Sequence, residues 1–154
     1  MWLRIIRFCS TFFTAIAMSF GLAHLFALPN KIGLSKENYL IVQQIYRGWA
    51  LSGIIIVLAL LSTLLLTGMV RMIKREFALT LTALLCMVAA QILFWVFTFP
   101  ANRITNNWTV LPENWMVLRK QWEYSHAVSA VLAVIAFVTL IIAQIIRKRS
   151  RSSF

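Results

Sequence analysis

Four long apolar runs decide what this chain can fold into. They cover residues 8–28, 49–70, 77–99 and 127–146, and polar or basic segments separate them. About 20 helical residues span the hydrocarbon core of a bilayer, and a helix satisfies its own backbone polar groups there. The pattern therefore predicts an all-α integral membrane four-helix bundle, formed as one transmembrane domain over residues 1–154.

The balance of residue types excludes an ordinary soluble domain. Hydrophobic residues make up 61% of the chain and charged residues only 12%, and a soluble domain of this length cannot bury so much apolar surface. The net charge of +11 is typical of nucleic-acid binding, but the basic residues cluster at the ends of the apolar runs. There they set topology and contact lipid headgroups. We therefore expect membrane lipid, and no nucleic acid, as a partner.

The first apolar run is a transmembrane helix in our interpretation, although Arg4 and Arg7 before it resemble the start of a signal peptide. It has 21 residues, whereas the apolar part of a signal peptide has about 7–15. Pro29 is expected to end this helix, because proline lacks an amide donor and restricts the residue before it. Ser35 is then placed to cap the next helix.

An even number of spans puts both termini on one side of the membrane. Nine basic residues fall on that side: Arg4, Arg7, Arg71, Lys74, Arg75, Arg147, Lys148, Arg149 and Arg151. Six fall on the other side: Lys31, Lys36, Arg47, Arg103, Arg119 and Lys120. The excess predicts a multi-pass protein of the cell membrane with both termini in the cytoplasm, and its basic tail contacts anionic lipid.

The two halves of the chain resemble each other. The matching boxes are residues 29–32 with 100–104, and residues 37–42 with 113–118. Because the boxes keep the same order, we predict two tandem helix-hairpin repeats, related by an axis along the membrane normal.

The repeat predicts amphipathic extensions on the second and fourth helices at the outer surface, over residues 36–48 and 112–126. The same register pairs Tyr46 with Trp122 and Arg47 with Glu123. We therefore predict an ion pair between Arg47 and Glu123, made directly or through His126.

The start of the fourth helix holds most of the residues that can carry chemistry. Helical periodicity places Trp115, Arg119, Trp122 and His126 on one face, and Glu123 lies one turn before His126 and is able to reach it. His24 lies just inside the apolar region, where an ionisable side chain is costly and marks a functional hypothesis. We predict one cavity toward the outer leaflet, bordered by His24, Tyr46, Asn102, Arg119, Trp122 and His126.

Simpler interpretations stay open for these residues. The tryptophans are typical of an aromatic belt at the membrane surface, and His24 can be a neutral side chain bonded to a neighbouring helix. Gln91 is interpreted as a contact between helices. Two histidines without an acidic or cysteine shell do not predict a metal site, and haem ligation by the pair is a weaker alternative. We expect no metal and no cofactor.

Several stretches resemble one family. They are His24–Lys31 (HLFALPNK), Val42–Gly48 (VQQIYRG), Asn107–Thr109 (NWT) and Leu118–His126 (LRKQWEYSH). These stretches resemble the anthrone oxygenase-like family, a large group of small four-helix membrane proteins that mostly lack an assigned function. The most specific part is the Arg-x-x-Trp-Glu-x-x-His pattern from Arg119 to His126. Ala27 departs from relatives that carry an acidic residue at that place.

The resemblance implies oxidation of electron-rich anthrones to quinones by oxygen, without a metal or a flavin. His126 would then remove a proton from the substrate, Arg119 and Asn102 would steady the anion, and Trp122 would stack on the ring. His24, Tyr46 and Glu123 complete the expected ligand-binding set. We therefore expect a membrane protein with an outer-leaflet pocket for a flat lipophilic small molecule. The alternative is a non-catalytic membrane protein that packs against a larger partner, and the sequence is compatible with a homo-oligomer.

Overall fold

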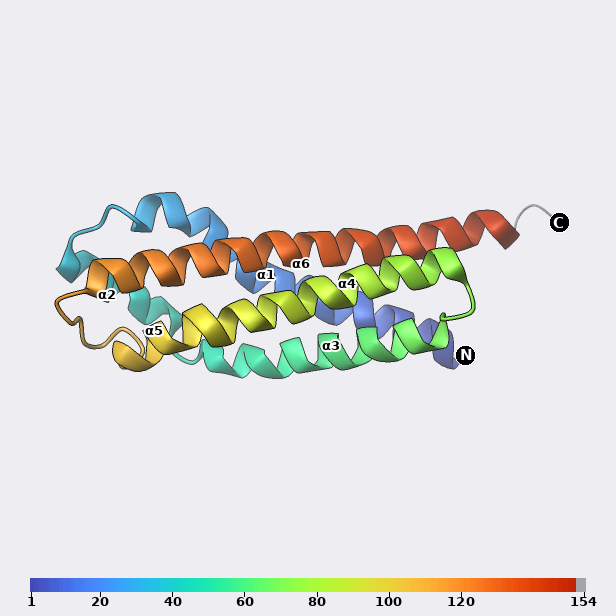
Figure 1. Ribbon diagram of the computed structural model, residues 1–154, viewed down its shortest axis with the longest axis horizontal. Helices are drawn as coiled ribbons and strands as arrows, with labels where there is room; N and C mark the ends of the chain where they lie inside the picture. The colour runs from blue at the N-terminus through green and yellow to red at the C-terminus, as the bar shows by residue number, and fades with distance from the viewer. Residues whose placement is uncertain (152–154) are drawn as a thin grey trace.

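The chain forms a bundle of four long helices that run antiparallel to their neighbours in sequence (Figure 1). The computed structural model describes the backbone of residues 1–151 and the side chains of residues 1–146, and all of the regular structure in that part is helical. Four stretches are long and apolar enough to cross a membrane: Trp2–Lys31, Trp49–Met69, Lys74–Ile104 and Trp115–Ile146. The predicted all-α class and the four apolar helices are confirmed.

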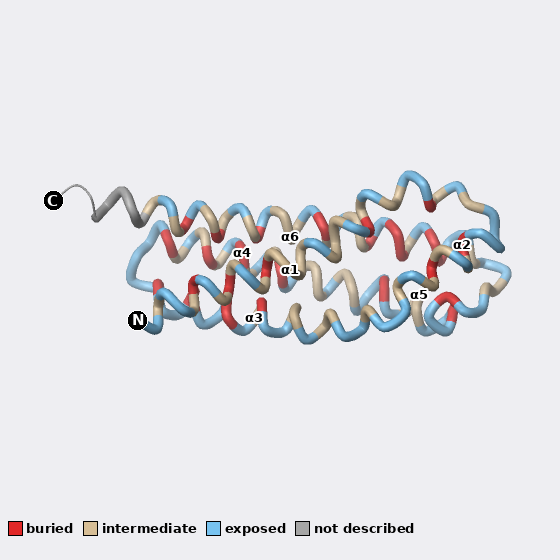
Figure 2. Tube along the Cα trace, turned by 180° about the vertical axis from the view of Figure 1, so that it is seen from behind, coloured by how far each residue is buried: buried red, intermediate tan, exposed pale blue. Residues whose placement is uncertain are grey.

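Small residues let the helices approach closely in the half of the bundle near the start of the chain. Helix α6 (Trp115–Arg151) packs along both α1 (Trp2–Lys31) and α4 (Lys74–Leu93), while α3 (Ser52–Met69) packs mainly along α1. The core there is made of Ala59, Leu66, Val70, Ala83, Met87, Ala136 and Leu140. Many Leu, Ile and Val residues are instead exposed, as an apolar solvent requires, and Figure 2 shows exposed positions along the lengths of the long helices.

Pro29, which was expected to end a helix, lies inside one, and so does Pro100. Helix α1 continues past Pro29 to Lys31. After α4, a π-helical turn (η3, Phe94–Thr98) leads directly into α5 (Phe99–Ile104), which contains Pro100. A proline ring crowds the carbonyl four residues earlier. For Pro100 that residue is Val96, which lies in the wider π turn. The prediction that Pro29 ends the first helix is therefore wrong, and the helical stretch that holds the third apolar run continues past residue 99 to Ile104.

The first predicted extension is not continuous with the second long helix. It forms a separate helix, α2 (Lys36–Gln43), and a short 3-10 turn, η1 (Gln44–Tyr46). Gly48 then adopts a left-handed conformation with φ 85° before a second 3-10 turn, η2 (Trp49–Leu51), and α3 begin. Ser35 caps α2 as expected, because its hydroxyl accepts from the Asn38 amide at 3.3 Å. The second extension begins at Trp115 and is continuous with α6.

The start of α1 and the end of α6 lie at one end of the bundle, and we call the opposite end the distal end (Figure 1). The distal end carries α2, α5 and the connection over residues 105–114. The side chains of the basic tail, residues 147–154, which we expect to contact anionic lipid, lie outside the described part of the chain.

Candidate functional site at the distal end

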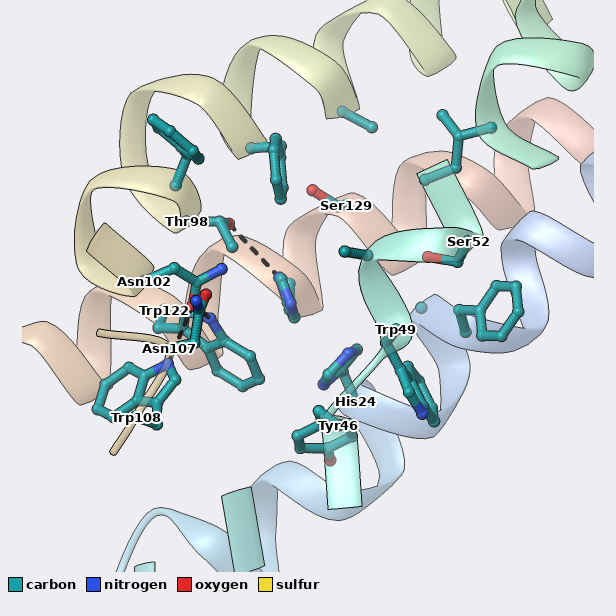
Figure 3. A pocket seen from close by; sticks show the side chains of 18 of the residues that line it. His24, Tyr46, Trp49, Ser52, Thr98, Asn102, Asn107, Trp108, Trp122 and Ser129 are labelled. Atoms are coloured by element: carbon teal, nitrogen blue, oxygen red, sulfur yellow. Dashed lines mark hydrogen bonds between the residues drawn. The ribbon is translucent and has the colours of Figure 1, made fainter. Parts of the chain in front are cut away.

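A cavity of about 880 Å³ lies among the helices toward the distal end (Figure 3). Its walls come from α1, from η1 and η2 with the start of α3, from the α4–η3–α5 helix, from the 106–109 loop and from α6. Ring side chains form much of the wall, among them Phe20, Trp49, Phe94, Phe99, Trp108 and Trp122. The site is therefore enclosed by all four long helical segments and is mainly apolar.

Trp122 stands at the centre of the aromatic wall. It is 3% exposed, and its ring centroid lies 4.2 Å from that of His126, 5.0 Å from that of His24 and 5.7 Å from that of Tyr46. Trp108 packs on it at 5.7 Å between centroids. These two tryptophans are inside the bundle, whereas Trp95 is 60% exposed, as an aromatic belt requires.

The two histidines of the chain meet in this wall. The ring centroids of His24 and His126 are 4.1 Å apart, with an angle of 64° between the ring planes. His24 is 8% exposed, and its Nδ1 has no hydrogen-bond partner among the described residues. Rings in contact leave no room for an iron between them, because each metal–nitrogen bond needs about 2 Å. In this arrangement the two histidines do not fit the alternative in which they ligate a haem iron.

Asn102 connects two tryptophans on the cavity wall. Its Oδ1 accepts from Trp108 Nε1 at 3.1 Å and from Trp122 Nε1 at 2.7 Å. The α5 segment, which exists because the helix continues through Pro100, carries Asn102 into this position. One carboxamide thus holds both indoles in place.

His126 is joined to a short hydrogen-bond chain on η3 and α6. Thr98 Oγ1 lies 3.4 Å from His126 Nδ1 and 2.7 Å from Ser125 Oγ. Ser125 in turn donates to the carbonyl oxygen of Trp122 at 2.9 Å. The π turn ends at Thr98, so the local helix geometry aims this hydroxyl at α6.

The predicted ion pair between Arg47 and Glu123 is wrong. Glu123 Oε1 lies 2.9 Å from Lys31 Nζ and accepts from the Tyr39 hydroxyl at 2.9 Å. Arg47 is exposed and contacts Gln44 Oε1 at 3.4 Å. The α-helix of the extension ends at Gln43 and the following 3-10 turn ends at Tyr46, while Arg47 itself has a non-helical ψ of 128°. Arg47 therefore does not continue a helix face toward α6.

Lys31 and Glu123 form a buried charge pair just behind the cavity wall. Their side chains are 3% and 0% exposed. The ammonium of Lys31 lies 4.6 Å from the centroid of the Tyr46 ring and 4.8 Å from that of the Trp122 ring. Glu123 therefore reaches neither the cavity nor His126, and its charge is used to hold Lys31 against the two aromatic rings.

Arg119, expected as a catalytic residue, is also outside the cavity. It donates to the Leu34 carbonyl at 2.7 Å, and its guanidinium carbon lies 4.6 Å from the centroid of the Trp115 ring and 5.3 Å from that of the Tyr39 ring. It thus fastens the turn after α1 to the start of α6.

The two tyrosines of the α2–η1 segment stay protonated. Burial, and next the Glu123 carboxylate, raise the pKa of Tyr46 to about 12. The same two causes raise the pKa of Tyr39 well above its usual range. Tyr39 is consequently a fixed donor to Glu123, and its oxygen accepts from Gln43 Nε2 at 2.9 Å.

The loop that closes the distal end is strained. Asn106, Asn107 and Trp108 have φ values of 46°, 54° and 62°, a left-handed run that non-glycine residues rarely adopt. The Thr105 hydroxyl accepts from the Trp108 amide at 3.1 Å, and the Trp108 carbonyl accepts from Gln44 Nε2 at 3.0 Å. These bonds and the buried indole hold the loop over the cavity. Backbone strain of this kind is characteristic of functional sites.

The structure thus brings together five of the predicted residues, which are His24, Tyr46, Asn102, Trp122 and His126. Sequence reasoning missed Thr98 and Gln43, which line the cavity, and Ser125, Lys31 and Tyr39, which support it. Gln91, interpreted as a contact between helices, lines the cavity. Nothing in the sequence distinguishes Thr98 as a cavity residue, because most hydroxyl side chains in apolar helices hydrogen-bond to their own backbone.

Among the described residues, no group of three His, Cys, Asp or Glu side chains is placed to hold a metal ion. Comparison with protein-family models, with curated proteins and with solved structures finds no match for this chain.

Proposed function

We propose that this chain is a multi-pass membrane protein that binds a flat, lipophilic small molecule in the distal cavity and removes a proton from it. The observation that carries the proposal is the contact between His24 and His126 inside an aromatic-lined cavity of about 880 Å³. Small-molecule sites are usually about 300–1,000 Å³, mostly apolar, with a few polar groups that converge. A molecule of several fused rings fits these dimensions.

The lining matches a flat ligand better than a flexible one. Trp122, Trp108 and Trp49 line the cavity with aromatic rings, and contact with aromatic rings favours a planar π system. Arg47 and Arg103 also line the cavity and are exposed, so negative charge that develops on the ligand is favoured there.

The reaction that we propose follows from the resemblance to the anthrone oxygenase-like family. His126 accepts a proton from the ligand, the resulting anion is stabilised by the Asn102 amide, and dioxygen is the oxidant. The balance is simple: one anthrone and one dioxygen give one anthraquinone and one water. Arg119 has no direct part in this reaction, because its guanidinium is bound to the Leu34 carbonyl.

We also propose that the distal end faces the outside of the cell membrane and that the termini are cytoplasmic. The distribution of basic residues supports this orientation. The pairing of Tyr46 with Trp122, at 5.7 Å between centroids, supports an origin of the two halves from one helix hairpin, because these positions match in the repeat.

The test is an assay on the purified protein in nanodiscs supplied with a hydroxyanthrone in air. Anthraquinone formation by absorbance, together with dioxygen uptake, should exceed the uncatalysed rate and should vanish in His126→Ala. Thr82→Val is the matched control, since Thr82 is exposed on α4 and bonds only the Ala78 carbonyl. If the protein binds the substrate saturably but does not turn it over, its function is binding and not catalysis. If it neither binds nor converts the substrate, and a specific protein co-purifies with it, the non-catalytic alternative is favoured.

A further inference from the structure

We infer that two separate hydrogen-bond chains fix the polarity of the cavity: Asn102 presents a donor, and His126 presents an acceptor. The ligand is then a planar arene that carries both a carbonyl oxygen and a hydroxyl proton. This inference rests on the proposed function, since it assumes that the cavity binds a small molecule.

The first chain orients the Asn102 carboxamide. An indole N–H is a donor only, so the atom that meets both Trp108 Nε1 and Trp122 Nε1 is the oxygen of Asn102. Its NH₂ group is consequently turned away from the two indoles, and Figure 3 shows the nitrogen end facing into the cavity. No described residue accepts a hydrogen bond from this nitrogen, which leaves a fixed donor for the ligand.

The second chain sets the tautomer of His126. A backbone carbonyl only accepts, so Ser125 gives its single hydroxyl proton to the Trp122 carbonyl. The 2.7 Å contact between Thr98 and Ser125 is then donated by Thr98. Thr98 Oγ1 is left to accept from His126 Nδ1 at 3.4 Å. The opposite direction would abandon the bond from Ser125 to the carbonyl, so the chain favours a proton on Nδ1 and a bare lone pair on Nε2.

The two fixed groups define a ligand class. The Asn102 amide requires a ligand acceptor, and His126 Nε2 requires a ligand donor. A hydroxyarene conjugated with a carbonyl supplies both. When its hydroxyl proton moves to Nε2, the electron pair stays on the ligand and delocalises to the carbonyl oxygen, where the Asn102 N–H receives it. Thr98 and Ser125 are positioning residues in this scheme, because they act through His126.

The first experiment measures the tautomer directly in the ligand-free protein. The chain has two histidines, so NMR of protein labelled with ¹⁵N-histidine in detergent micelles gives two sets of ring signals, and His24→Phe assigns them. We expect the Nδ1–H form for His126 in the wild type and in Thr98→Ser. Thr98→Val should shift the ring toward the Nε2–H form, and Thr82→Val should not. A wild-type His126 in the Nε2–H form would overturn the inference.

The second experiment measures binding of three matched probes to the protein in nanodiscs. 6-Acetyl-2-naphthol carries both groups, 2-acetyl-6-methoxynaphthalene lacks the donor, and 6-ethyl-2-naphthol lacks the carbonyl. Each lost hydrogen bond should weaken binding about tenfold. Asn102→Asp keeps an acceptor for both indoles but replaces the donor, so it should remove the preference for the acetyl group. Thr98→Val should remove the preference for the free hydroxyl.

The outcomes separate the two proposals. Equal affinity for all three probes, in the wild type, overturns the assigned polarity while the binding function stands. Failure of every probe to bind overturns the ligand class and argues against the proposed function, whatever tautomer the NMR shows.

Discussion

Replacing Lys31 by Met tests whether the buried charge pair behind the cavity supports its wall. The pair is enclosed, with side-chain exposures of 3% and 0%, so solvent does not replace the lost partner. Removing one partner of a buried pair costs about 3–5 kcal/mol, because the other charge stays buried alone. The cation–π contacts of Lys31 with Tyr46 and Trp122 add to the loss. We expect Lys31→Met to destabilise the bundle by about 3–5 kcal/mol.

A double-mutant cycle separates the charge from the packing. Glu123→Gln keeps an acceptor for the Tyr39 hydroxyl, which donates to Oε1 at 2.9 Å, but it strands the Lys31 ammonium. The double variant Lys31→Met/Glu123→Gln removes both charges of this pair and keeps that hydrogen bond. It should therefore be more stable than either single variant, which requires a coupling energy larger than the cost of Lys31→Met alone, that is, above about 3 kcal/mol.

The assay is reversible unfolding in mixed micelles, followed by the fluorescence of the six tryptophans, one of which, Trp122, packs against Lys31. Lys36→Met is the matched control, because Lys36 is exposed at the start of α2, and it should change stability by no more than about 0.5 kcal/mol. A Lys31→Met variant that unfolds within that same range would refute the reasoning, since it would mean that the pair is solvated or absent.

Three further predictions concern topology, backbone and pH. Reporter fusions at Phe154 and within residues 105–112 should report opposite sides of the membrane, and the same compartment for both would contradict the four-span topology. Gly48→Ala should cost about 1–2 kcal/mol in the same unfolding assay, purely from the backbone, because φ is 85° and nothing lies within 4 Å of the added Cβ; unchanged stability would contradict that conformation. The pKa of Tyr46 is raised to about 12, above an unfolded value of about 10, so its contribution to stability is complete below pH 10 and is lost as the pH rises toward 12. Tyr46→Phe should flatten that part of a stability-versus-pH curve.

The four helices were predictable, because the lengths of the apolar runs depend only on composition. The buried position of the Lys31 side chain was not predictable from the sequence. A lysine after Pro29 and Asn30 is typical of a solvated turn, but the helix continues through the proline to Lys31. That extra half turn directs the side chain inward to Glu123. Arg47 lies off the helix face that the repeat predicted for it, because α2 ends at Gln43 and the 3-10 turn after it ends at Tyr46.

The meeting of the two histidines follows from a close approach that the sequence hid. Gly21 packs on α6 so tightly that a Cβ there would lie 3.2 Å from Ala130 Cα. His24 lies three residues after Gly21, and His126 lies four residues before Ala130. Because α1 and α6 are antiparallel, both steps lead about one turn from the contact toward the distal end. The glycine–alanine contact therefore sets the spacing at which the imidazoles meet, at 4.1 Å between centroids. A larger residue at position 21 would separate the helices and open the histidine pair without touching either ring.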